Sequence, residues 1–600
     1  MSHAAYSEQE NEAVVSTERS YLVASFWFFG ASLTVLLTCY MYGLRVPLYD
    51  FSYPINIGYR LSLGQVPYRD FDLPLTPGTF YVSALSNTLF GWNATTSLLL
   101  TLIISLTSFA LLLDILVCNA VLNPLSTNPR IRIFYLASVV ATALSGLNYI
   151  LAMPFYDNMA ILAVLLSLNL GVRAWTSTRR WLWVAAGCGT LLPFLFKQNI
   201  GVAYLVGVIL AVSVTVLNNY QKPPAIYERK KLLYAATGLA ATAGGGVALL
   251  QISGSLRPFV SQVFIGAAQS KSLASLETYA PYQSIWVFGV VVCGCVAALV
   301  TSSRWVAILI AWPWALFGAL SAVATFHLLN TPPNGYMPTY ALPTRMLPVL
   351  TVSGVVITLV AAWRSRLFGS PAAPLALILG SVMFGAQLSQ GSWGSSYALP
   401  PVVLLLGIVT LAWILPMQSR LAIAIVIAAI ATFSIWTPLY AASGDRLRFV
   451  DAFTEQTMGT TGRIASIPAD PKEHDAWVEL AHLLDTKSLT VAELPMEDPL
   501  PYLASPGYKP WWRCDQANSN TCPSISGLWD ALLTHPPDVL LVKERTQLSA
   551  EVEPVSGAVI AALELCYRPK FRIPGFYLVY LDLQPNDCFR RIQVQNPSAE

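Results

Sequence analysis

Charged residues are scarce in this sequence. Asp, Glu, Lys and Arg make up only 11% of the 600 residues, whereas a soluble globular protein carries about 25%. Apolar residues reach 55%, and the mean hydropathy is +0.55. These values exclude an ordinary soluble protein and predict an α-helical polytopic membrane protein with a soluble part attached.

Signals of several other protein classes are also missing. The formal net charge of +3 is too small to suggest a nucleic-acid partner. Residues 1–20 are polar and acidic and lack the basic region of a cleavable signal peptide, so we expect a short tail followed by a retained anchor. The sequence has no His/Cys zinc spacing, no P-loop and no nucleophile elbow.

Long apolar runs dominate residues 21–440 instead. A helix needs about 20 apolar residues to cross the hydrocarbon core of a bilayer. On this basis we predict thirteen spans, the fifth and sixth forming a tight hairpin with Lys197 at its tip. The predicted spans are 21–44, 96–118, 133–153, 158–175, 181–196, 200–217, 232–253, 284–303, 305–325, 346–363, 373–391, 398–415 and 421–440.

The orientation follows from the basic residues of alternate loops, because loops rich in Lys and Arg stay in the cytoplasm. The N-terminus is therefore predicted to be cytoplasmic, and the first loop and the C-terminal region extracytoplasmic. The richer set of loops holds Arg130, Arg132, Arg173, Arg179, Arg180, Lys222, Arg229, Lys230, Lys231, Arg304, Arg364, Arg366 and Arg420.

The region 441–600 is polar and predicts one small extracytoplasmic α/β domain. Helical spacing marks 474–485 and 526–533, and apolar runs at 538–544 and 575–583 predict strands. Cysteines at 514 and 522, and at 566 and 588, would form disulfides on the outer face or remain free thiols.

The first outer loop, 45–95, is far longer than a simple connector. Ser62 to Gly64 predicts a turn between two short amphipathic pieces. Thr76 and Pro77 predict the start of a helix, with Thr76 as N-cap and Pro77 at the first helical position.

Aspartates gather in the outer loops of a region that otherwise avoids charge. Asp50 follows the first span, Asp70 and Asp72 are two residues apart and would share one side of an extended segment, and Asp157 begins the fourth span. A carboxylate next to an acceptor hydroxyl acts as a general base, and a cluster of two or three binds a divalent cation. The alternatives are an N-cap for Asp157, a turn cap for Asp72 and a solvated interfacial position for Asp50.

Lys197 is the most informative cation. It ends an apolar run slightly too short to cross the bilayer, so we expect it near the outer surface or just below it. An ionisable group at that depth is a functional candidate, and a lipid-linked phosphate is its natural partner. The alternative is that the side chain snorkels to the headgroups. Arg69, Arg257 and Arg345 are weaker candidates for the same role.

The first outer loop resembles that of the GT-C superfamily of lipid-dependent glycosyltransferases. The nearest likeness is the branch of the aminoarabinose transferases, the protein O-mannosyltransferases and the RgtA/B/C/D-like enzymes. The resemblance rests on Tyr49-Asp50, the Gly64-Gln-Val-Pro-Tyr-Arg-Asp70 step, Pro77-Gly78 and Leu89-Phe-Gly91. Asp157 and the Lys197-Gln-Asn-Ile-Gly201 segment also match in kind.

The resemblance implies transfer of a sugar from a polyprenyl-phosphate donor to a glycan, lipid or protein hydroxyl outside the bacterial inner (plasma) membrane. Asp50 would be the general base of an inverting displacement, and Lys197 with an arginine such as Arg69 would stabilise the departing phosphate. Asp70, Asp72 and Asp157 would position the acceptor or a cation. Many relatives carry a second acidic residue after the first Asp, but Phe51 stands there in this chain.

Two other functional classes stay open. One is a transporter or flippase for a lipid-linked substrate, and the other is a non-catalytic scaffold for envelope assembly. Transporters often show paired halves with ionisable residues near the bilayer midplane. Asp50, Asp70, Asp72 and Asp157 are predicted to lie in outer loops, and no matching halves are visible, which favours surface chemistry.

Overall fold

The computed structural model describes most of the helical region and the strands of the C-terminal region. The described residues are 25, 27–39, 48–92, 94–118, 155–219, 226–266, 303–330, 356, 360, 372–387, 399–414, 419–442, 482, 489–494, 509–510, 537–543, 567–573 and 577–582.

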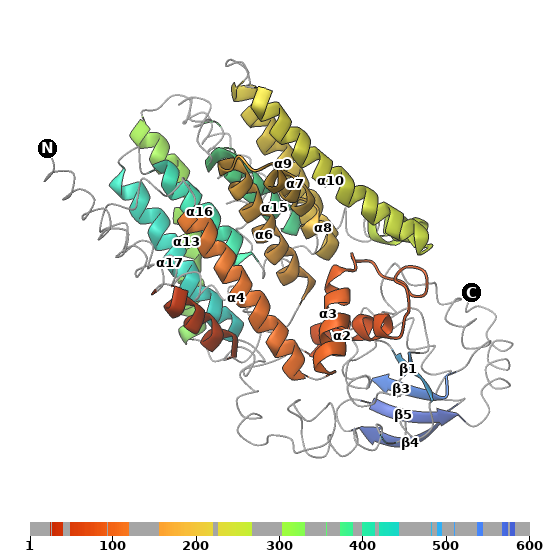
Figure 1. Ribbon diagram of the computed structural model, residues 1–600. Helices are drawn as coiled ribbons and strands as arrows, with labels where there is room; N and C mark the ends of the chain where they lie inside the picture. The colour runs from red at the N-terminus through yellow and green to blue at the C-terminus, as the bar shows by residue number, and fades with distance from the viewer. Residues whose placement is uncertain are drawn as a thin grey trace, which may run out of the picture.

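Helices build the whole of the described membrane region (Figure 1). Their bounds in chain order are α2 (Leu48–Ser62), α3 (Gly78–Phe90), α4 (Ala94–Cys118), α6 (Tyr156–Thr176), α7 (Arg180–Gly189), α8 (Leu192–Phe196), α9 (Gln198–Asn219), α10 (Ile226–Ile252), α11 (Leu256–Phe259), the π-helix η2 (Val260–Gly266), α13 (Ser303–Asn330), α15 (Ala372–Gln387), α16 (Pro400–Ile414) and α17 (Arg420–Ala442).

Six helices of the described part are long and apolar enough to cross a membrane, and four shorter apolar helices accompany them. These elements coincide with ten of the thirteen predicted spans and make the chain a multi-pass membrane protein. The predicted spans 133–153, 284–303 and 346–363 lie almost entirely outside the described residues, so the count of thirteen stays a prediction.

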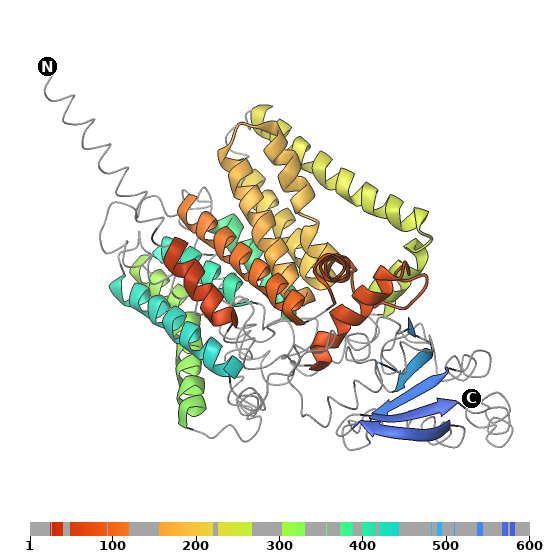
Figure 2. The same ribbon diagram turned by 60° about the horizontal axis from the view of Figure 1, so that its bottom comes forward.

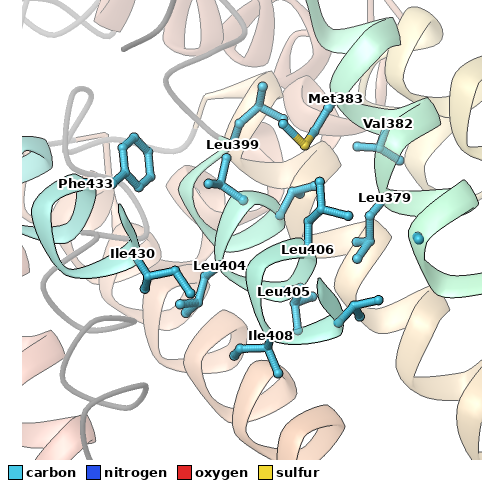
Figure 3. Packing of buried hydrophobic residues seen from close by; sticks show 14 of the residues in the cluster. Leu379, Val382, Met383, Leu399, Leu404, Leu405, Leu406, Ile408, Ile430 and Phe433 are labelled. Carbon is cyan, nitrogen blue, oxygen red and sulfur yellow. The ribbon is translucent and has the colours of Figure 1, made fainter. Parts of the chain in front are cut away.

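The main core surrounds α16, which is apolar on all sides and packs against α13, α15 and α17. A helix without a polar face is stable only when it is buried. Leu399, Val402 and Leu406 are almost completely buried between α15 and α17. Figure 3 shows the α16 leucines between Leu379 and Val382 on one side and Ile430 and Phe433 on the other.

Glycines bring α7 and α10 into close contact. A Cβ atom at Gly187 would lie 1.9 Å from the Ala235 carbonyl oxygen, and one at Gly238 would lie 2.1 Å from the Val184 carbonyl oxygen. Small residues are typical of membrane helix interfaces because they let backbones approach closely. This contact fixes α10 to the rest of the region, although most of its surface is exposed.

The C-terminal strands form one mixed sheet in the order β2-β1-β3-β5-β4, on the side of the helical region where α2 and α3 lie (Figure 2). β1 pairs in parallel with β2 and β3, and β5 pairs antiparallel with β3 and β4. The strand bounds are β1 (Thr490–Leu494), β2 (Lys509–Pro510), β3 (Val539–Lys543), β4 (Tyr567–Ile573) and β5 (Tyr577–Asp582).

The predicted strands 538–544 and 575–583 are confirmed by β3 and β5. The predicted helices 474–485 and 526–533 lie outside the described residues, apart from position 482, and so do all four cysteines of the predicted disulfides. The domain boundaries at 20 and 440, and the extracytoplasmic position of the sheet, stay predictions.

Candidate active site

The loop between α2 and α3 is folded around buried aromatic side chains. α2 ends at Ser62, and Gly64 takes a φ of +81°, which confirms the predicted turn. Tyr68 has a φ of 68°, a conformation that costs free energy for a residue with a side chain. Its phenol donates a hydrogen bond to the Leu75 carbonyl at 2.7 Å, and its ring lies 5.1 Å from that of Phe259. These contacts hold the loop in its unusual shape.

Replacing Tyr68 by Phe is expected to remove that hydrogen bond while keeping the ring contacts. The Leu75 carbonyl then loses its partner, and we expect a loss of about 1 kcal/mol of stability. The measurement is the thermal unfolding midpoint of the purified protein in detergent. Tyr81→Phe on the exposed side of α3 is the matched control. Equal midpoints for the two variants would contradict the role assigned to the phenol.

Asp70 shapes this loop. One of its carboxylate oxygens accepts a hydrogen bond from the Val66 amide at 2.7 Å, and the Asp70 amide donates to the Val66 carbonyl at 2.9 Å. The other oxygen forms an ion pair with Arg69 at 2.8 Å. Arg69 also donates to the Ser253 carbonyl at 3.4 Å, so the two side chains tie the loop to the end of α10.

Asp72 has a different partner. Gln262 of η2 donates to the Asp72 carboxylate at 2.8 Å and accepts from the Leu73 amide at 2.8 Å. The buried Ser255 hydroxyl donates to the Pro67 carbonyl at 2.9 Å. The segment 255–262 is therefore hydrogen-bonded to the loop at both of its ends. Gln262 and Ser255 had no signal in the sequence, because each is about 190 residues away from its partner.

The third aspartate, Asp157, forms a buried ion pair with Lys197. Each of the two residues is only 2% exposed, and the Lys197 ammonium lies 4.7 Å from the centre of the Tyr156 ring. Asp157 sits in the first turn of α6, whose N-cap is Phe155, and Lys197 lies between α8 and α9. Lys197 lies at the turn between α8 and α9 as predicted, but α9 packs mainly against α15, so the tight hairpin of α7 with α9 is not confirmed. The N-cap alternative for Asp157 and the snorkelling alternative for Lys197 are wrong.

The beginning of α3 lies against the segment that carries Lys197. Gln198 donates to the Pro74 carbonyl at 2.9 Å, and a Cβ atom at Gly78 would lie 2.5 Å from the Leu195 carbonyl oxygen. Contacts also join α3 to α6. We call this meeting point of the first turns of α3 and α6 with residues 195–198 the α3 junction.

The α3 junction contains buried hydroxyls without partners among the described residues. Thr76 is 1% exposed and Thr79 is fully buried, and neither hydroxyl has a hydrogen-bond partner there. One carboxylate oxygen of Asp157 and the amide oxygen of Gln198 also have no hydrogen-bond partner among the described residues. The helix begins at Gly78 after Pro77 without a side-chain cap, so the prediction of Thr76 as N-cap is wrong.

The remaining predicted site residues are Asp50, Arg257 and Arg345. Asp50 lies in the first turn of α2, about 18 Å along the helix axis from Ser62, and its side chain is outside the described part. Arg257 is exposed on α11, and Arg345 lies outside the described residues.

The divalent cation that Asp70, Asp72 and Asp157 are predicted to hold stays a prediction. Asp70, Asp72 and Asp157 each have a separate protein partner, as described above. Among the residues that the structure describes, no three His, Cys, Asp or Glu side chains gather closely enough to bind a metal ion.

Comparison with family models and with curated proteins finds no match. Among solved structures, the chain is similar to the crystal structure of ArnT from Cupriavidus metallidurans bound to undecaprenyl phosphate, at 12% sequence identity and a TM-score of 0.45. The alignment covers 93% of this chain and 98% of that one. A likeness of this size does not establish the function of this chain.

Proposed function

We propose that the protein is a membrane glycosyltransferase that moves a hexosyl or pentosyl group from a polyprenyl-phosphate donor to an acceptor hydroxyl of a glycan, lipid or protein. The observation that carries the proposal is the α3 junction. Lys197 is held inside the protein beside the first turn of α6, and the segment that carries it contacts the start of α3. Two hydroxyls at the start of α3 are buried and have no partner among the described residues, and together these features suit a phosphate ligand.

The α3 junction offers hydrogen-bond donors to a phosphate, whereas the acceptor oxygens of Asp157 and Gln198 suit donors such as the hydroxyls of a sugar. Amide groups at the start of a helix and hydroxyls donate hydrogen bonds, and the ammonium of Lys197 supplies positive charge. Unpartnered buried hydroxyls cost free energy unless a ligand accepts their hydrogen bonds. A phosphate oxygen would accept from both Thr76 and Thr79, which would explain why these side chains are buried there.

In the proposed reaction, the oxygen of the acceptor hydroxyl attacks the anomeric carbon as the bond from that carbon to the phosphate oxygen breaks. Asp50 takes the hydroxyl proton, and the configuration at the anomeric carbon inverts. Lys197 stabilises the negative charge that develops on the leaving phosphate, and Asp157 holds Lys197 in position. Asp70 and Asp72 shape the loop instead of contacting the reacting atoms.

Replacing Thr79 by Val tests the ligand site, with binding of polyprenyl phosphate to the detergent-purified chain as the readout. Removing an unpartnered hydroxyl is expected to stabilise the ligand-free protein by about 1–3 kcal/mol. The same change removes a donor to the phosphate, so we expect binding to weaken by about tenfold.

Thr101→Val is the matched control for this experiment. Thr101 is also fully buried, but its hydroxyl donates to the Ser97 carbonyl at 2.7 Å on α4. This variant should lose stability and bind polyprenyl phosphate like the wild type. If Thr79→Val loses stability in the same way and binds the lipid normally, the hydroxyl of Thr79 is not part of a phosphate site.

A flippase for a lipid-linked substrate is the second candidate, because a buried ion pair within a membrane protein is also typical of transporters. Reconstitution into vesicles with a fluorescent polyprenyl-phosphate sugar separates the two. Movement of the label between leaflets without release of polyprenyl phosphate supports the flippase, and release in the presence of an acceptor supports the transferase. A scaffold would neither move the label between leaflets nor release polyprenyl phosphate.

A further inference from the structure

A second site lies at the opposite end of the helices from the α3 junction. An apolar cavity of about 400 Å³ is enclosed by α6, α7, α9, α10 and α15, which lie together in Figure 1. Its lining includes Trp175 at the end of α6, Trp183 at the start of α7, Thr215 near the end of α9 and Leu232 near the start of α10. All four positions belong to the end predicted to face the cytoplasm.

The cavity has the depth of one lipid leaflet. Its lining on α9 extends from Tyr204 to Thr215, or about 16 Å along the helix axis. Half of the hydrocarbon core of a bilayer is about 15 Å thick. An apolar cavity offers water almost no hydrogen-bond partners. Because this cavity opens among membrane helices, a hydrocarbon chain is the occupant that its lining favours.

Basic and aromatic side chains surround the cytoplasmic end of the cavity. The Lys231 ammonium lies 5.3 Å from the centre of the Trp183 ring, and the Arg180 guanidinium lies 5.8 Å from that of Tyr234. Arg179 and Lys230, both exposed, are their neighbours in sequence. Basic pockets between helices at the cytoplasmic surface favour anionic headgroups.

Two tryptophans line the cytoplasmic end of the cavity. Trp183 is 8% exposed and lines the cavity, and its indole N–H has no hydrogen-bond partner among the described residues. A buried indole N–H normally finds an acceptor. The Trp175 ring, 6.1 Å from that of Trp183, adds the aromatic surface common at the bilayer interface.

We propose that this cavity binds an anionic phospholipid of the cytoplasmic leaflet, with an acyl chain between α6, α9 and α15 and the phosphate near Arg180 and Lys231. The site is separate from the α3 junction and does not depend on the proposed reaction. The lipid fills the space beside α10, which approaches α7 closely at Gly187 and Gly238.

Gly171→Leu tests the site by filling it. Gly171 lines the cavity, and a Cβ atom there would meet no atom within 4 Å, so a larger side chain enters open space. A leucine takes the place of about four methylene groups of the acyl chain, so we expect affinity to fall by about a hundredfold. The readout is native mass spectrometry of the delipidated full chain titrated with phosphatidylglycerol.

Gly245→Leu is the matched control. Gly245 lies exposed on α10, away from the cavity, and also has open space at its Cβ position. This variant should bind phosphatidylglycerol like the wild type. Equal binding by the Gly171 and Gly245 variants would overturn the site.

Headgroup selectivity is tested with Arg180→Gln and Lys231→Gln. Each change should reduce the preference for phosphatidylglycerol over phosphatidylcholine by about fivefold. A wild type that binds both lipids equally would overturn the anionic assignment. Displacement of phosphatidylglycerol from this site by equimolar polyprenyl phosphate would assign the cavity to the substrate instead.

Discussion

Replacing Asp50 by Asn is expected to lower the rate of sugar transfer by about 10²- to 10⁴-fold, the range that a positioned general base contributes. Asn has nearly the same shape but cannot accept the proton of the acceptor hydroxyl. Asp50 lies in the first turn of α2, where a negative charge or a neutral amide is tolerated. We therefore expect the variant to fold and to bind polyprenyl phosphate like the wild type. The measurement is the initial rate of transfer by purified protein.

Asp50→Glu is the matched variant for this prediction, because it keeps a carboxylate at a slightly different distance. It should retain more activity than Asp50→Asn. A transfer rate for Asp50→Asn within a few-fold of the wild type would remove Asp50 as the base. Loss of both activity and lipid binding would indicate a structural role for the residue.

Replacing Lys197 by Met is expected to have the largest effect on stability. The change leaves the Asp157 carboxylate buried without its partner, and breaking a buried pair in this way costs about 3–5 kcal/mol. The thermal unfolding midpoint in detergent should fall accordingly. Adding Asp157→Asn removes the remaining charge, so the double variant should recover most of the lost stability.

The double variant separates the structural role of Lys197 from its proposed function. It lacks the ammonium that would stabilise the leaving phosphate, so its transfer rate should stay far below that of the wild type despite the recovered fold. A double variant that regains both stability and transfer would show that the ion pair only supports the structure.

Local sequence patterns predicted the helices of this fold well. The predicted spans 96–118 and 200–217 correspond closely to α4 and α9. A membrane helix can be predicted in this way because it consists of one continuous run of apolar residues. Asp114 of α4 forms an ion pair with Arg173 of α6 at 2.6 Å.

Contacts between distant segments could not be predicted in the same way. The sequence marked Asp157 and Lys197 separately as candidates, but nothing in local hydropathy indicates that residues 40 positions apart form a pair. The aspartates of the first loop were interpreted as one cluster, whereas the fold gives Asp70 and Asp72 different partners. The partner of Asp72, Gln262, comes from a segment that only the tertiary structure places beside the loop.

The most direct test of the proposed function is transfer by the purified full chain from a panel of polyprenyl-phosphate-linked hexoses and pentoses to glycan, lipid and peptide acceptors. The predicted result is the joint appearance of free polyprenyl phosphate and a glycosylated acceptor with at least one donor, both dependent on Asp50. Folded protein that binds polyprenyl phosphate but releases none from any donor, and carries the labelled lipid across vesicles instead, would contradict the transferase and establish transport.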